Sequence, residues 1–233
     1  MDRMAKTVLT CAVVSLMAGP ALASNAVRFS QTYGGGGAST GSPTYTRDYV
    51  ELLNVSNATV DVSGWALFYS SATGTFNNTN TFAFPPGTSI KPCGYLMIAL
   101  GSTGTTGGAF PVTPDLSSTV INMSATAGKI ALVSSGSPNG GTCPTANSAV
   151  VVDFVAYGST ANCSEGSPAG GTTNQQGEVR NGGGVTDTDN NLSDFTVTAN
   201  PVPHNSASAS PAECTAVPAQ RTSWGSIKTI YYR

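Results

Sequence analysis

The chain has 233 residues, and only 9% of them are charged, whereas globular proteins average about 25%. This composition excludes helical bundles and coiled coils, whose outer faces need Glu, Lys and Arg. A formal net charge of −2 argues against a strongly basic nucleic-acid-binding protein. Apolar residues still make up 39% of the chain and form runs, which excludes a disordered protein.

The first 23 residues are predicted to be a signal peptide. Arg3 and Lys6 supply positive charge before a mostly apolar run, residues 7–18, and Ala-Leu-Ala at residues 21–23 is a small-x-small cleavage site. The run is shorter than the ~20 residues that a membrane span needs. We therefore expect cleavage after Ala23 and a secreted protein, extracellular or at the cell surface, with no transmembrane segment.

The remainder of the chain alternates apolar and polar residues at a period near two. Short runs of this kind, separated by Gly, Ser, Thr, Asn and Pro, are typical of an all-β sandwich. Trp65, Leu67 and Tyr69 are each two residues apart, which predicts that their side chains share one buried face of a strand. The expected strands are residues 27–33, 49–53, 60–62, 65–69, 95–100, 129–133, 150–157 and 194–198.

Four cysteines follow the predicted signal peptide, and an exported protein is expected to oxidise them to disulfides. Cys143 and Cys163 bracket one expected strand and are the favoured pair, with Cys93 and Cys214 as the second. The loop of about twenty residues that the favoured pair closes corresponds to ~3 kcal/mol of stabilisation. A zinc site is the alternative, but no Cys-x-x-Cys or nearby Cys/His spacing supports it.

Several segments, in order, resemble a known family. Residues 28–37 (Arg-Phe-Ser-Gln-Thr-Tyr-Gly-Gly-Gly-Gly), 48–54 (Asp-Tyr-Val-Glu-Leu-Leu-Asn) and 60–65 (Val-Asp-Val-Ser-Gly-Trp) are similar to the opening of a bacterial lamin-tail domain. The resemblance continues through residues 124–133, 152–158, 161–166 and 187–191, and covers roughly residues 25–208. It implies an immunoglobulin-like β-sandwich and a non-catalytic accessory module of secreted or surface proteins, here as a stand-alone domain.

The domain organisation is predicted as a signal peptide (1–23), a β-sandwich (24–208), and a Ser/Ala/Pro linker with a C-terminal tail (209–233). Residues 221–233 are aromatic and basic, with apolar side chains at helical spacing, which indicates a sorting or attachment signal. A final strand that pairs with the edge of the sandwich is the alternative.

One cluster carries metal-ligating side chains. Asp187, Asp189, Asn191 and Asp194 offer carboxylate and amide oxygens, which are the ligands that Ca²⁺ prefers. The pattern lacks the closing Glu of a helix-loop-helix calcium loop, so a weak calcium site is predicted. The alternative is a turn held by hydrogen bonds from Asp and Asn side chains to the backbone.

No catalytic constellation is evident, and we expect no enzyme. His204 is the single histidine, lies between prolines and asparagines, and is predicted to be an exposed loop residue. Asp48 and Glu51 are three residues apart on an expected strand, so they should face opposite sides of the sheet. Gly34 to Gly37 lack the Gly-Lys-Ser/Thr ending of a phosphate loop and are interpreted as a flexible connection.

These observations predict a secreted, non-catalytic β-sandwich module for surface association, adhesion or extracellular-matrix packing. Its partner would be a cell-surface or matrix component, with polysaccharide among the candidates. The alternatives are an accessory protein to an extracellular hydrolase or nuclease, and a calcium-dependent glycan-binding module. The acidic net charge argues against nucleic acid as a direct partner, because neutralising phosphates needs clustered Lys or Arg.

Overall fold

A computed structural model describes residues 26–138, 141–144 and 150–214. The predicted signal peptide (1–23) and the predicted attachment signal (221–233) lie outside these residues.

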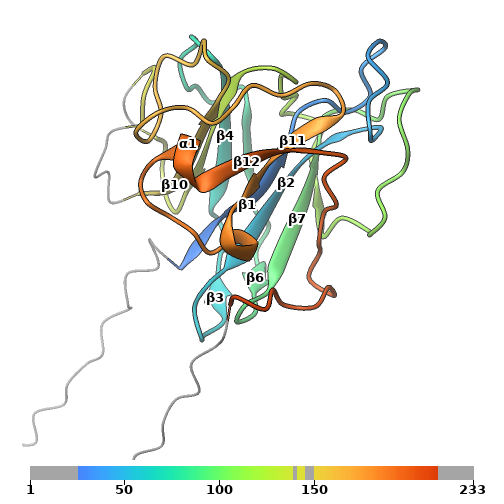
Figure 1. Cartoon of the computed structure of the whole chain (residues 1–233). Coiled ribbons are helices and arrows are strands. Elements are labelled where there is room, and N and C mark those ends of the chain that lie inside the picture. The colour runs from blue at the N-terminus through green and yellow to red at the C-terminus, as the bar shows by residue number, and fades with distance from the viewer. Residues whose placement is uncertain (1–25, 139–140, 145–149, 215–233) are drawn as a thin grey trace, which may run out of the picture.

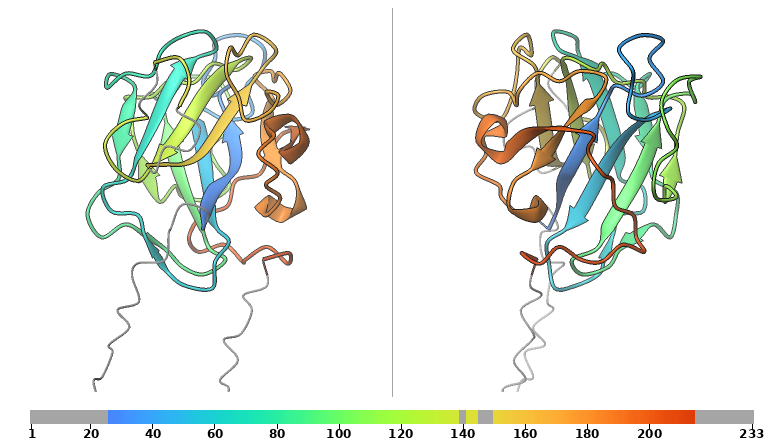
Figure 2. Two further views of the ribbon diagram at one scale, coloured as in Figure 1. Left: turned by 90° about the vertical axis from the view of Figure 1, so that its left-hand side faces the viewer. Right: turned by 45° about the vertical axis from the view of Figure 1, so that its right-hand side comes forward.

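Twelve strands in the described part of the chain form two facing sheets and a short ribbon (Figures 1 and 2). The six-stranded sheet has the order β12 (Phe195–Ala199), β11 (Gln176–Arg180), β1 (Val27–Tyr33), β2 (Asp48–Asn54), β7 (Tyr95–Leu100), β8 (Leu116–Ser117). The four-stranded sheet has the order β10 (Val151–Tyr157), β9 (Gly128–Val133), β4 (Ala66–Ser71), β5 (Thr81–Ala83). The ribbon pairs β3 (Val60–Asp61) with β6 (Ser89–Ile90).

Neighbouring strands are antiparallel except β7 and β8. Within residues 26–138, 141–144 and 150–214, the helical segments are α1 (Asn191–Asp194) and one 3-10 turn (Gly182–Gly184). The predicted all-β, immunoglobulin-like sandwich is confirmed.

The main core lies between the two sheets. Burying each large apolar side chain there contributes about 1.5–3 kcal/mol relative to leaving it exposed. Trp65, Leu67 and Tyr69 all belong to this core, so the prediction that they share a buried face is confirmed. Further core side chains come from both sheets: Phe29, Val50, Leu52, Leu96, Ile98, Ile130, Leu132, Val155 and Tyr157.

The strand predictions fail most clearly at β11. Its inward-facing residues include Glu178 and Arg180, both 1% exposed, whereas Val179 between them is only partly buried. A strand that turns its charged residues inward does not show the apolar alternation that marks an ordinary strand. The expected strand 194–198 begins instead at Phe195, because Asp194 ends α1. The other missed strands, β5, β6 and β8, have only two or three residues.

The Arg180 side chain connects the two sheets. Its Nη2 donates to Oδ2 of Asp153 on β10 at 2.8 Å, and its Nε donates to the carbonyl of Phe29 on β1 at 2.6 Å. The guanidinium carbon also lies 4.5 Å from the ring centroid of Phe195. One fully buried cation therefore contacts three strands, and its planar set of donors allows it to bind all of them at once.

Phe29 needs these partners because its strand is paired incompletely. The ladder between β1 and β11 covers only Gln31 and Thr32. The Phe29 N–H donates to Asp153 Oδ2 at 2.6 Å, while its carbonyl accepts from Arg180. Unpaired buried backbone groups are costly, so the ion pair replaces the missing ladder bonds at this point.

A second buried cation, Lys129, lies on β9, an inner strand of the four-stranded sheet. It is 0% exposed, and its ammonium donates to the Gly74 and Thr142 carbonyls and to Asn162 Oδ1, at 2.8, 2.5 and 2.7 Å. Burial lowers the pKa of Lys129. Three oxygen acceptors match the three N–H groups of an ammonium, so the buried charge is fully hydrogen-bonded. The lysine thereby links the loop at Gly74 to the two loops that the Cys143–Cys163 bridge joins.

Both predicted disulfides are present, Cys143–Cys163 and Cys93–Cys214. The second fastens residues 200–214, here called the C-terminal strap, across the outer face of the six-stranded sheet (Figure 2). Along the strap, the Pro201 carbonyl accepts from Tyr45 Oη at 2.8 Å, and the Val202 carbonyl accepts from Gln31 Nε2 at 3.0 Å. The beginning of the Ser/Ala/Pro-rich segment is thus bound to the sandwich.

We predict that Arg180→Met lowers the free energy of unfolding by about 3–5 kcal/mol, because it leaves the Asp153 carboxylate buried without its partner. Urea denaturation measures this loss. Val179→Ala changes the neighbouring outward-facing residue and should cost less than about 1 kcal/mol. Equal losses in the two variants would contradict the central role of the ion pair.

We predict that the two disulfides contribute unequally. The Cys93–Cys214 bridge spans 121 residues and the Cys143–Cys163 bridge spans 20. Loop-closure entropy gives about 5 kcal/mol for the longer loop and about 3 kcal/mol for the shorter. Paired Cys→Ser variants compared by thermal melting should therefore lose more stability at the long bridge, and the reverse order would be inconsistent with this entropic account.

Candidate functional site

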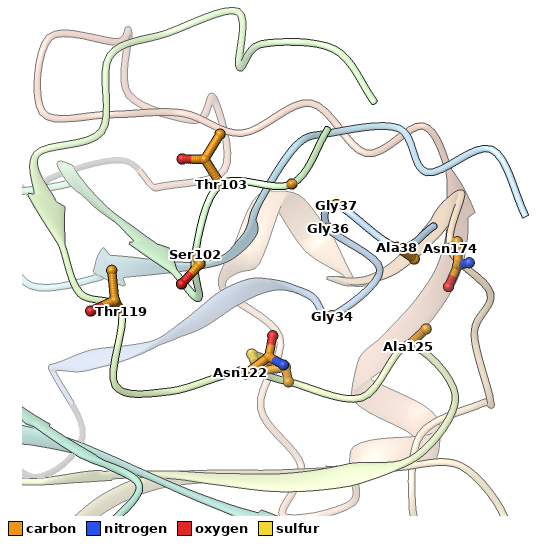
Figure 3. Close-up of a pocket in the computed structure, with 12 residues that line it drawn as sticks. Gly34, Gly36, Gly37, Ala38, Ser102, Thr103, Thr119, Asn122, Ala125 and Asn174 are labelled. Atoms are coloured by element: carbon orange, nitrogen blue, oxygen red, sulfur yellow. The ribbon is translucent and has the colours of Figure 1, made fainter. Parts of the chain in front are cut away.

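A cavity of about 480 Å³ opens at one end of the sandwich (Figure 3). Three separate loops form its walls: residues 34–38 after β1, residues 102–104 after β7, and residues 119–125 before β9. Asn174, just before β11, completes the lining. We call this feature the glycine-walled cavity, because four of its lining residues are glycines.

The glycines allow the loops to approach closely. A Cβ on Gly34 would lie 2.3 Å from the carbonyl oxygen of Ser124, and one on Gly36 would lie 1.9 Å from the carbonyl carbon of Arg47. These neighbours are backbone atoms that cannot rotate away, so a larger residue would displace the loop. The interpretation of Gly34 to Gly37 as a flexible connection is therefore corrected: the segment is packed against its neighbours.

Asp48, at the start of β2, joins two walls of the cavity. Its Oδ1 accepts the Gly36 N–H at 2.8 Å, and its Oδ2 accepts the Met123 N–H at 2.7 Å. The side chain is 2% exposed, and burial raises the pKa of Asp48 to about 7 despite these two hydrogen bonds. The shape of the cavity thus depends on one carboxyl group beneath it.

Neutral polar side chains line the cavity. Ser102, Thr103 and Thr119 supply hydroxyl groups, and Asn122 and Asn174 supply amides, while the apolar lining side chains are short or flexible. None of the described lining residues is charged. The site therefore offers hydrogen-bond donors and acceptors without a counter-charge. Sequence reasoning missed these residues because they lie in Ser/Thr/Gly-rich connections that carry no motif.

The residues of the predicted calcium cluster surround α1, and two of them bind inside the protein. Asp194 is 0% exposed and accepts the Thr188 N–H at 3.0 Å with each carboxylate oxygen. Asn191, also 0% exposed, donates to the Phe154 carbonyl and accepts the Ala156 N–H, both at 3.0 Å. These bonds fasten α1 to β10.

The other two residues of the cluster are exposed. Asp187 forms ion pairs with Arg180 and Arg28, with N–O distances of 3.4 and 3.5 Å, and Asp189 has a positive φ of 54°. Asp187 and Asp194 thus both face Nη1 of Arg180, at 3.4 and 3.7 Å, whereas the Asn191 amide binds the backbone of β10. Among the described residues, no group of three or more His, Cys, Asp or Glu could hold a metal ion. The calcium site stays a prediction.

His204 lies on the strap and not freely in solvent. Its side chain is 41% exposed, its Nδ1 is 3.2 Å from Oε2 of Glu51, and its ring stacks on Tyr95 at 4.7 Å between centroids. The hydrogen bond to Glu51 raises the pKa of His204. The prediction of an exposed loop histidine is corrected accordingly. Asp48 and Glu51 contact different partners on opposite faces of the sheet, as predicted.

Two further carboxyl groups, the buried Glu178 and the partly buried Glu165, escaped the sequence analysis. Glu178 accepts a 2.5 Å hydrogen bond from the Thr32 hydroxyl, and burial raises its pKa to about 7. Burial, together with the charge of Asp153, raises the pKa of Glu165 to about 8. Nothing in the local sequence distinguishes these residues from exposed acids, since tertiary packing alone covers them.

The protein-family model of the Lamin Tail Domain matches residues 20–162, which is more than half of the chain. The chain belongs to the Lamin Tail Domain family. The match ends before β11, so it leaves out the strand that carries Arg180 and Glu178. The lamin-tail resemblance predicted from the sequence is confirmed.

No curated protein matches this lamin-tail-domain chain. Among solved structures, a DUF4876 family protein from Bacteroides thetaiotaomicron is similar, with 13% identity and a TM-score of 0.49. The similarity covers 81% of this chain and 75% of the other.

We predict that the domain is more stable in mild acid than in base. Asp48, Glu165 and Glu178 have higher pKa values in the folded protein than their ordinary values of 3.8 or 4.5. Stability from such groups is complete below the unfolded pKa and is lost as the pH rises through the folded pKa. The melting temperature should therefore fall between about pH 4.5 and pH 8.

Glu178→Gln removes one of these titrations and should flatten the pH profile of the melting temperature. Asp61→Asn, at an exposed position, is the control. Hydrogen bonds from Ser63 lower the pKa of Asp61, so its titration lies below the range of interest and the profile between about pH 4.5 and pH 8 should not change. A melting temperature that rises steadily from pH 5 to pH 8 would contradict the argument.

We expect calorimetric titration with Ca²⁺ to give no saturable heat, because the oxygens of Asp194 and Asn191 already accept internal hydrogen bonds. Asp194→Asn should still destabilise the turn, since it weakens the bonds to Thr188. A saturable Ca²⁺ heat that disappears in Asp189→Asn would instead establish the predicted calcium site.

Proposed function

We propose that this lamin-tail-domain protein is a secreted, non-catalytic module that associates with a component of the cell surface or extracellular matrix. The chemistry of the cavity carries the proposal. The concave surface is lined by neutral hydroxyl, amide and backbone groups. The strongly perturbed carboxyl groups lie inside the fold and hold strands or loops together. Such an arrangement suits binding more than acid–base or nucleophilic chemistry.

One observation and one sequence-based prediction support secretion. The chain contains the disulfides Cys93–Cys214 and Cys143–Cys163, which persist in oxidising compartments. The predicted signal peptide at residues 1–23 supplies a route to such a compartment. In the part of the chain that the structure describes, no helix has the length and apolar character that crossing a membrane requires.

Retention of the protein on its producing cells tests the proposal. Fluorescently labelled mature protein, beginning at Ser24, is incubated with washed cells and isolated matrix in EDTA and in Ca²⁺. We expect equal, saturable retention in both buffers. Protein that stays in the supernatant with both materials would contradict the proposal.

The same experiment separates the alternatives. Retention that requires Ca²⁺ would favour the calcium-dependent glycan-binding module. Retention only with a co-purified hydrolase or nuclease would favour the accessory role. A reduced sample, in which the disulfides are opened, serves as the unfolded control for non-specific adhesion.

A further inference from the structure

We propose that the glycine-walled cavity binds a neutral carbohydrate through hydrogen bonds between its hydroxyl and amide side chains and the hydroxyl groups of the sugar. This inference rests on the proposed function and names the chemical class of the surface component. It is independent of the acidic cluster at α1 and of calcium.

The size and place of the cavity suit a small ligand. Its volume of about 480 Å³ lies within the range of about 300–1,000 Å³ that small-molecule sites occupy. The cavity lies where loops 34–38, 102–104 and 119–125 converge from distant parts of the chain (Figure 3). Loop clusters at one end of an immunoglobulin-like sandwich are common binding surfaces, because the sheets hold them rigidly.

The cavity gathers polar side chains that the fold does not use. Ser102, Thr103, Thr119 and Asn122 are exposed, and none of them forms a side-chain hydrogen bond with another described residue. In Figure 3 they lie on one side of the cavity, and Gly34, Gly36 and Gly37 lie on the other. Each hydroxyl or amide group both donates and accepts, which is the pattern that sugar hydroxyl groups also present.

The absence of charge among the described lining residues selects a neutral ligand. The buried carboxyl group of Asp48 lies beneath the wall, and both of its oxygens accept backbone hydrogen bonds. A charged sugar would therefore lose water without gaining a counter-charge. No described lining residue carries an aromatic ring, so hydrogen bonds and small apolar contacts hold the ligand and the affinity should be weak, about 1 mM.

The cavity is formed before any ligand arrives. Asp48 links the Gly36 and Met123 walls, and the Gly37 and Gly104 N–H groups donate to the Tyr45 and Thr46 carbonyls at 2.9 and 2.8 Å. A rigid site loses little conformational entropy on binding, so a few hydrogen bonds suffice for weak binding of a sugar.

The test is a titration of ¹⁵N-labelled mature protein with cellohexaose, maltohexaose and mannohexaose in EDTA, followed by amide chemical shifts. We expect at least one of these sugars to shift the amide signals of Gly34, Gly37 and Gly104 in a saturable way. Hexagalacturonate, a charged sugar of similar length, should bind at least 10-fold more weakly.

A triple variant removes the unused polar groups: Ser102→Ala, Thr119→Val, Asn122→Leu. These side chains are exposed and make no hydrogen bond within the described chain, so the melting temperature should not change while the affinity falls at least about 10-fold. The matched control makes the same three kinds of change near the opposite end of the sandwich and on the strap: Ser210→Ala, Thr59→Val, Asn57→Leu. The control should bind like the wild type.

Three results would overturn the inference: no response to any of the neutral sugars, equal binding of hexagalacturonate, or unchanged binding in the triple variant. The cell-retention experiment remains separate. If wild-type protein and triple variant are retained equally on cells while neither responds to the sugars, the surface-association function stands and the carbohydrate assignment fails.

Discussion

The buried ion pair between Arg180 and Asp153 is the interaction on which the sandwich depends. It lies next to the point where the pairing between β1 and β11 ends. There it binds the backbone N–H and carbonyl of Phe29, which that pairing does not include. A pair of charges in a low-dielectric interior is stable only when each has further hydrogen-bond partners. Here the backbone of a neighbouring strand supplies those partners, so charge and strand geometry stabilise each other.

The same principle recurs at smaller scale in the cavity and beside the disulfide loop. Asp48 binds two backbone N–H groups, and Lys129 binds three oxygens, two of them carbonyls. In each case a charged or titratable side chain connects loops that have few apolar residues of their own. A protein with only 9% charged residues therefore places several of them in its interior, where each holds many backbone groups.

Because Asp48 holds the cavity loops from beneath, the exposed side chains of these loops are available for contact with other molecules. The side chains of Ser102, Thr119 and Asn122 are not needed to hold the cavity in shape, because backbone hydrogen bonds and glycine packing already define its walls. Within the same loops, the residues that hold the loops in place therefore differ from the residues whose side chains face the cavity. Changes in the exposed side chains can alter what the cavity contacts without altering its shape.

Much of the fold was predictable because burial leaves a local pattern. Alternation located most of the long strands, and Trp65, Leu67 and Tyr69 share the face that their spacing predicted. The Cys143–Cys163 pairing was favoured because these cysteines bracket one strand, and Cys93–Cys214 was the pair that remained. The resemblance to lamin-tail domains, read from short segments in order, also proved correct.

The candidate site was not predictable, and neither was β11. The outward-facing Val179 lies between two buried charged residues, a pattern that local hydrophobicity assigns to no strand. Three loops far apart in the sequence form the cavity, and none contains a motif. By itself the sequence determined fold class and family, because these follow from local periodicity and residue order. For the disulfides it only favoured the pairing that the structure shows. Only the tertiary structure decided which carboxyl groups are buried and which loops meet, because both depend on contacts between distant segments.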